Sequence, residues 1–186
     1  MSWLLKGEPD MFIPSRMQCL LLLAVLAVMT PFAEANAILI PGDIRRSAPD
    51  FALQDSAGST VRLSDYKGKV VLLDFWATWC DGCKTEVPWY VEFQKKYGEQ
   101  GLSAVGVSMD EGWTPVRQFL AENKVNYPIV IGDYDVTKLY KIKNMPVTLL
   151  IDKNGKVAEW HVGMVDHKVF ENEIQTLLKE PATQNP

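Results

Sequence analysis

The chain has 186 residues, of which 47% are hydrophobic and 23% are charged, a balance typical of an ordinary globular protein. The net charge of −4 comes without a basic run, which argues against nucleic acid as a partner. Of the three cysteines, Cys19 lies in an apolar N-terminal stretch. The other two lie three positions apart and indicate one local site, not the disulfide framework of a small secreted domain.

An export signal is predicted at the N-terminus. The eleven residues Cys19–Met29 carry no charge, which matches the apolar part of a signal peptide and falls short of the roughly 20 residues of a membrane-spanning helix. Ala-Asn-Ala at 35–37 offers a cleavage site. An uncleaved membrane anchor and a helix buried in the fold are the alternatives. Because residues 1–10 include two acidic residues, which are unusual in a signal peptide, we hypothesise that translation starts at Met11.

These features divide the chain into three parts. We expect residues 1–40 to be a signal peptide or membrane anchor with a short linker, residues 41–180 to form one folded domain, and residues 181–186 to be a disordered tail. A domain of about 140 residues can bury a real core without a disulfide or metal. The export signal predicts a periplasmic or otherwise extracytoplasmic location.

The first elements of the domain follow from hydrophobic periodicity. Residues 51–53 and 61–63 alternate as strands do, around a turn that contains glycine, and predict a β-hairpin. One helical turn is expected over 64–66. Val70–Trp76 is an almost unbroken apolar run, as expected for a central strand that is covered on both faces. A helix is expected from about Cys83 to Tyr97.

The rest of the chain continues the alternation of strands and helices. Strands are predicted at 102–108, 129–131, 147–151 and 156–162, and helices at about 114–123, 135–140 and 166–179. Thr114 is expected to cap its helix, with Pro115 at the first helical position. The order is a hairpin, βαβ, an inserted αβα and a final ββα unit. It predicts an α/β fold with a mixed central sheet and helices on both faces.

The chemistry is concentrated at Trp79-Cys80-Asp81-Gly82-Cys83, where a buried strand meets a helix. Cys80 is expected at the helix N-terminus, where free N–H groups and the helix dipole stabilise a thiolate. The spacing places both sulfurs on one face of the first turn, close enough to bond, and Gly82 is expected to give the loop freedom to close. Lowering a thiol pKa from about 8.5 to about 6.5 increases the thiolate fraction at neutral pH, but the rate of attack gains little because intrinsic nucleophilicity falls as the pKa falls. The main effect is to stabilise the dithiol form.

The region 48–179 resembles the thioredoxin-like proteins of the TlpA/ResA type, which are related to the AhpC/TSA family. The resemblance rests on Ala-Pro-Asp-Phe at 48–51, Leu-Ser-Asp-Tyr-Lys-Gly-Lys at 63–69, Asp-Phe-Trp-Ala-Thr-Trp-Cys at 74–80, and Pro146 before Val-Thr-Leu-Leu-Ile. It implies a thioredoxin-like three-layer sandwich with an N-terminal β-hairpin and a central αβ insertion. It also implies an exported thiol-disulfide oxidoreductase, with no cofactor beyond a redox-active Cys80–Cys83 disulfide.

The resemblance also implies catalytic roles for four residues. Cys80 corresponds to the exposed nucleophile, and Cys83 corresponds to the buried resolving thiol. Asp74 corresponds to the buried acid that helps to deprotonate the second cysteine, and Glu86 corresponds to the active-site glutamate of ResA-type reductases. Two such acids would each raise the pKa of the other by like-charge repulsion. The alternatives are a polar residue at a strand end for Asp74 and a solvated helix residue for Glu86.

Substrate contacts are expected around the disulfide. Pro146 corresponds to the cis-proline of the family, which makes Met145 the residue whose backbone pairs with an extended substrate; its alternative is a plain strand-edge residue. Trp79, Asp81 and Gly82 complete the predicted contacts. Asp81-Gly82 replaces the commoner Glu-Pro or Gly-Pro, which leaves open whether the protein mainly reduces or oxidises. The resemblance implies protein thiols and disulfides as partners, with apocytochrome c as one candidate, and a membrane thiol-disulfide electron donor.

The same residues allow three other interpretations: a zinc site, a peroxidase and a copper chaperone. A Cys-x-x-Cys pair is half of a zinc site, for which His161 and His167 are the remaining candidate ligands. A peroxiredoxin-like peroxidase shares the Ala-Pro-Asp-Phe opening, but its Pro-x-x-x-Thr-x-x-Cys motif is missing. A copper chaperone of the Sco type uses Cys-x-x-x-Cys, one residue longer than the spacing here. Asp110-Glu111 is interpreted as an acidic turn without a specific role.

Overall fold

The computed structural model describes residues 39–182. The predicted signal peptide or anchor and most of the predicted tail therefore lie outside the described residues, at 1–38 and 183–186. Between residues 39 and 182, no helix combines the length and the apolar character that crossing a membrane requires.

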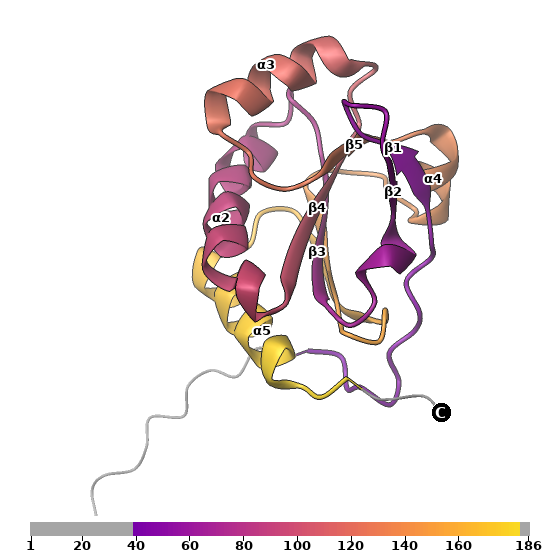
Figure 1. The fold of residues 1–186 in the computed structure, drawn as a ribbon, viewed down its shortest axis with the longest axis vertical. Helices are drawn as coiled ribbons and strands as arrows, with labels where there is room; N and C mark the ends of the chain where they lie inside the picture. The colour runs from indigo at the N-terminus through magenta and orange to yellow at the C-terminus, as the bar shows by residue number, and fades with distance from the viewer. Residues whose placement is uncertain (1–38, 183–186) are drawn as a thin grey trace, which may run out of the picture. The chain divides into compact units, whose positions relative to one another are not determined.

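A five-stranded sheet with the order β5-β4-β3-β6-β7 organises the domain; Figure 1 labels three of its strands, β3, β4 and β5. Its strands are β3 (Val70–Trp76), β4 (Leu102–Ser108), β5 (Ile129–Ile131), β6 (Val147–Ile151) and β7 (Val157–Val162). β3 runs parallel to β4 and antiparallel to β6, so the sheet is mixed, as predicted. Every residue of β3 and β4 is buried, which explains why both strands read as continuous apolar runs.

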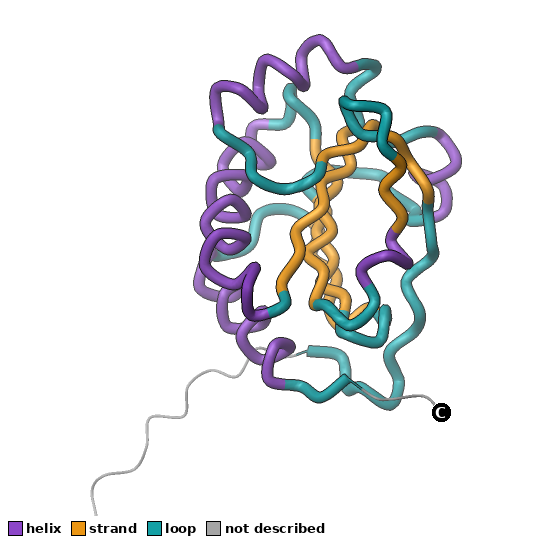
Figure 2. Tube along the Cα trace, in the orientation of Figure 1, coloured by secondary structure: helices purple, strands orange, loops and turns teal. Residues whose placement is uncertain are grey.

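Further elements cover both faces of the sheet (Figures 1 and 2). The helices α2 (Asp81–Tyr97), α3 (Trp113–Asn123) and α5 (His167–Lys179) lie on one face. The hairpin β1 (Ala52–Gln54) and β2 (Thr60–Arg62), the short helix η1 (Leu63–Tyr66) and α4 (Tyr134–Leu139) lie on the other. A second short helix, η2 (Gly98–Gln100), joins α2 to β4. This arrangement confirms the predicted three-layer sandwich with an N-terminal hairpin.

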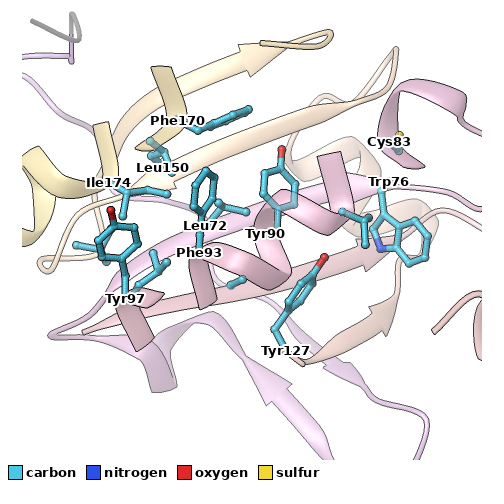
Figure 3. Packing of buried hydrophobic residues seen from close by; sticks show 14 of the residues in the cluster. Leu72, Trp76, Cys83, Tyr90, Phe93, Tyr97, Tyr127, Leu150, Phe170 and Ile174 are labelled. Carbon is cyan, nitrogen blue, oxygen red and sulfur yellow. The ribbon is translucent and has the colours of Figure 1, made fainter. Parts of the chain in front are cut away.

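Two clusters of buried side chains hold the layers together. Under α2 and α5, Leu72 and Leu150 of the sheet pack with aromatic residues of the helices (Figure 3). Tyr90 of α2 meets Phe170 of α5 edge to face, with ring centroids 5.6 Å apart. On the other face, Phe75 packs against Tyr140, at 5.0 Å between centroids. The first cluster fixes α2 across β3 and so fixes the strand-to-helix junction that carries the cysteines.

The predicted starts of α2 and α3 differ from the structure in ways that their caps explain. α2 begins at Asp81, earlier than predicted, because Cys80 itself acts as the N-cap and its sulfur accepts the Cys83 N–H at 3.3 Å. α3 begins at Trp113 after Gly112, which makes no side-chain cap. Thr114 is therefore not the cap. Pro115 is the third residue of α3, whereas we predicted it at the first position; the first turn of a helix has N–H groups without intrahelical partners, so it tolerates proline there.

Candidate active site

The two cysteines form a disulfide at the first turn of α2. Their sulfurs are 2.08 Å apart and their Cα atoms 5.3 Å apart. Cys80 is 9% exposed at the N-cap, and Cys83 is 1% exposed one turn further into the core. The pair therefore has an outer and an inner sulfur.

Asp110 fixes the loop that leads into the disulfide. Its carboxylate accepts hydrogen bonds from the Thr78 N–H at 2.9 Å, the Thr78 hydroxyl at 2.6 Å and the Ser108 hydroxyl at 2.7 Å. The interpretation of Asp110 as part of an acidic turn without a role was wrong. Because β3 and β4 are parallel, their carboxyl ends meet at one edge, and this places Asp110 beside the loop that carries Trp79 and Cys80.

The Met145–Pro146 peptide bond is cis, as the family resemblance implied. Pro146 lies against the disulfide loop, since its Cδ atom is 3.3 Å from the position that a Cβ atom on Gly82 would occupy. Its carbonyl oxygen accepts the Gly163 N–H at 2.8 Å. The proline is thus held between the first turn of α2 and the loop that follows β7.

A groove of about 600 Å³ opens beside Cys80. Its lining includes four of the five predicted substrate contacts, Trp79, Asp81, Gly82 and Met145, and residues from α4 and the loop after it. Trp79 is 65% exposed, so its indole is available to a partner. A smaller cavity of about 230 Å³ lies between η1 and the turn that joins β6 to β7, and its lining contains none of the predicted site residues.

The loop between β7 and α5 closes the other side of the site and was missed in the sequence. Met164 is 59% exposed, and its Cγ atom lies 3.1 Å from the position of a Cβ atom on Gly82. Gly82 lies in the first turn of α2 and does not give the loop the freedom that we expected. Its lack of a side chain instead allows Met164 to approach closely. The glycine at 163, with φ of 84°, is the one sequence signal that marks this turn.

Asp74 lies in the middle of β3, the strand that leads to the disulfide loop. It is 1% exposed, and within residues 39–182 neither of its carboxylate oxygens has a hydrogen-bond partner. Burial raises its pKa well above the usual value, and the charge of Glu86 adds to the rise. The neighbouring hydroxyl of Thr148, a potential hydrogen-bond donor to the carboxylate, partly offsets the rise. Thr148 is the residue opposite Asp74 in the β3–β6 register. Asp74 is therefore a deeply buried acid and not a polar strand end.

Glu86 is also buried, one turn beyond Cys83 on α2. Its Oε2 atom accepts the Tyr90 hydroxyl at 3.2 Å, and its Oε1 atom accepts the Val165 N–H at 3.3 Å. Burial raises the pKa of Glu86, while these two hydrogen bonds and the nearby His161 hold the rise back. With 1% of its surface exposed, Glu86 is not a solvated helix residue.

Both histidines have partners other than a metal. His161 Nε2 lies 2.7 Å from Glu173 Oε2, and His167 packs against Phe93 with ring centroids 4.7 Å apart. In the described part of the chain, no three side chains of His, Cys, Asp or Glu gather in a way that could hold a metal ion. The contacts of both histidines are therefore those of packing and hydrogen-bonded side chains.

Comparison with known proteins identifies the family to which the chain is similar. The AhpC/TSA family matches residues 44–160. The chain is 36% identical over 147 residues to the thiol-disulfide oxidoreductase ResA of Geobacillus kaustophilus, an alignment that covers 78% of this chain and 82% of that protein. It is 38% identical over 159 residues to ResA of Oceanobacillus iheyensis, covering 83% and 81%.

Solved structures show the same similarity. A proposed thiol:disulfide interchange protein DsbE from Chlorobium tepidum superimposes with a TM-score of 0.69 at 39% identity, covering 72% of this chain and 96% of that one. The thioredoxin domain of a thiol-disulfide oxidoreductase from Bacteroides vulgatus gives a TM-score of 0.66 at 27% identity, covering 72% and 96%. The chain therefore belongs to the AhpC/TSA family, and it is a thiol-disulfide oxidoreductase with a thioredoxin-like fold.

Proposed function

We propose that this protein is an exported disulfide reductase in which Cys80 is the nucleophile and Cys83 the resolving thiol. The observation that carries the proposal is the difference between the surroundings of the two sulfurs. Cys80 caps a helix beside an open groove. Cys83 lies inside the core, on the face of α2 that also carries the buried Glu86.

The first step of the reaction takes place at Cys80. In the reduced protein its thiolate attacks one sulfur of a substrate disulfide, a new disulfide forms between Cys80 and the substrate, and the other substrate sulfur leaves as a thiolate. Stabilisation by the helix N-terminus favours the ionised form of Cys80. The groove with Trp79 on its rim and Met145 along its wall provides the surface on which an extended segment would lie.

The second step takes place at Cys83. Its thiol loses a proton, the thiolate attacks Cys80, the second substrate sulfur leaves, and the Cys80–Cys83 disulfide forms. Two electrons pass to the substrate. Asp74 and Glu86 are the acids that we propose accept the proton. Burial raises the pKa of both, which supports this role because a raised pKa brings a carboxyl group closer to the range in which it exchanges protons at neutral pH.

Location and partners follow from the family resemblance. The apolar stretch Cys19–Met29 supports export, with the N-terminus either cleaved or kept as an anchor. A membrane thiol-disulfide donor would return the two electrons and regenerate the dithiol. Protein disulfides are the proposed substrates, and reduction of apocytochrome c during cytochrome c maturation is the specific role that the resemblance favours.

The reduction potential of the Cys80–Cys83 pair tests the proposed direction of electron flow. We expect a value near that of thioredoxin, about −270 mV, since a reductase must hold its electrons at a low potential. The measurement is equilibration with defined dithiol and disulfide mixtures, in protein whose Cys19 is replaced by serine so that only the pair titrates. A value near −120 mV would instead identify an oxidase. Rapid consumption of hydrogen peroxide by Cys83→Ser would favour a peroxidase.

A further inference from the structure

A chain of hydrogen bonds leads from Glu86 through Tyr90 to Thr148, the residue that lies opposite Asp74 in the sheet. The Tyr90 hydroxyl donates to Glu86 at 3.2 Å and lies 2.8 Å from the Thr148 hydroxyl, where either oxygen is able to donate. Thr148 in turn faces Asp74 across the β3–β6 pair. Tyr90, Thr148 and both acids are at most 1% exposed, and Figure 3 shows Tyr90 extending from α2 among the buried side chains.

This chain has two arrangements of its hydrogens, because each hydroxyl carries one hydrogen. When Glu86 is ionised, Tyr90 donates to Glu86 and Thr148 donates to Tyr90, which leaves no hydrogen for Asp74. When Glu86 is protonated, it donates to Tyr90, Tyr90 donates to Thr148, and the Thr148 hydrogen is free to turn to the Asp74 carboxylate. Each arrangement stabilises one carboxylate and withdraws a donor from the other.

We propose that Tyr90 and Thr148 are positioning residues that join Glu86 and Asp74 into one unit with a single negative charge, carried by either acid in turn. The inference rests on the proposed function, since this unit would accept the Cys83 proton. Two separate acids so deeply buried would each have to ionise alone, at the full cost of desolvation. A shared charge leaves one carboxylate always paired with a donor.

Other polar groups around the unit act on its charge. From β7, His161 faces Thr148 in the register of the sheet and favours the ionised form of Glu86. His161 is itself held by Glu173 of α5. The hydroxyl of Tyr127, before β5, is buried without a partner among residues 39–182, and the charge of Asp74 acts on it. From the β7–α5 loop, the backbone N–H of residue 165 donates to Glu86.

The test measures how fast Cys83 resolves a mixed disulfide as the pH changes. Dithiobis-nitrobenzoate releases one coloured thiolate when Cys80 attacks it and a second when Cys83 resolves the product. In Tyr90→Phe, Glu86 loses a donor and stays protonated to higher pH. We expect the second phase to be about tenfold slower near pH 6 and its midpoint to move upward. The first phase should keep the wild-type rate. In a Glu86→Gln background, adding Tyr90→Phe should change the second phase less than about twofold.

Three further variants separate this role from a loss of packing. Thr148→Ser keeps the hydroxyl and should keep the wild-type profile, whereas Thr148→Val, of similar volume, should move the midpoint upward. Tyr97→Phe is the matched control, because its hydroxyl lies on the same helix but bonds to Glu171. Superimposed profiles for wild type and Tyr90→Phe, or equal slowing with and without Glu86, would overturn the inference alone. A wild-type protein without a second phase would overturn the proposed function as well.

Discussion

A Cys83→Ser variant is expected to accumulate as a mixed disulfide with its substrate, and a Cys80→Ser variant is expected to form none. Cys80, at the helix cap, lines the groove, whereas Cys83 in the first turn of α2 is 1% exposed. Without Cys83 nothing resolves the intermediate, so essentially all of the protein should be trapped. Mass spectrometry under non-reducing conditions, after incubation with a disulfide-bonded peptide, measures the trapped fraction.

The control for this trapping experiment is a variant with serine at both Cys80 and Cys83. It should trap nothing, which would exclude Cys19 as the source of any adduct. Equal trapping by the two single variants would contradict the assignment of an outer nucleophile and an inner resolving thiol.

Asp74→Asn is expected to stabilise the oxidised protein at neutral pH while slowing the Cys83 step by about 100-fold, a typical contribution of a general base. Burial raises the pKa of Asp74 in the folded state, with a further rise from the charge of Glu86. The folded state therefore binds the proton more tightly than the unfolded state, and wild-type stability falls as the pH rises from the unfolded pKa toward the folded one. Over that window, the advantage of the variant in the free energy of unfolding should grow by about 1.4 kcal/mol per pH unit.

Urea unfolding across this pH range measures the difference, and Asp50→Asn provides a control of opposite sign. Burial tends to raise the pKa of Asp50, but hydrogen bonds from Ser64 and Phe51 lower it below the usual value. Its carboxylate therefore stabilises the fold above the unfolded pKa, and that contribution is lost as the pH falls through the folded pKa. A pH-independent difference between wild type and Asp74→Asn would show that Asp74 does not ionise abnormally.

The bounds of β3, β4, β5 and β6 could be predicted from the sequence, whereas the starts of α2 and α3 could not. Val70–Trp76 and Leu102–Ser108 have the bounds that their apolar runs predicted, because burial on both faces leaves a continuous signal. The start of α2 was placed late because a cysteine sulfur is an uncommon cap. The start of α3 was placed at Thr114, since sequence patterns alone favoured a threonine over the glycine that precedes the helix.

At the site, the residues on the signature motifs were predicted and their supports were not. Cys80, Cys83, Asp74 and Glu86 lie at fixed distances along one stretch of chain, where spacing is informative. Asp110 and Met164 reach the site only through the packing of distant segments. Two weaker signals were present in the sequence: Tyr90 lies one turn after Glu86, and Thr148 is a polar residue within a buried strand. Both signals gain meaning only when the β3–β6 register is known.

The most direct test of the central claim is the order and pH dependence with which the two thiols of the reduced protein are alkylated. Iodoacetamide modification, quenched at intervals and mapped by mass spectrometry, reports each cysteine separately. A helix-capping thiolate predicts that Cys80 reacts first, with a midpoint below the usual thiol pKa of about 8.5, while Cys83 stays protected. Faster reaction at Cys83, or equal reaction at both with a midpoint near 8.5, would contradict the account.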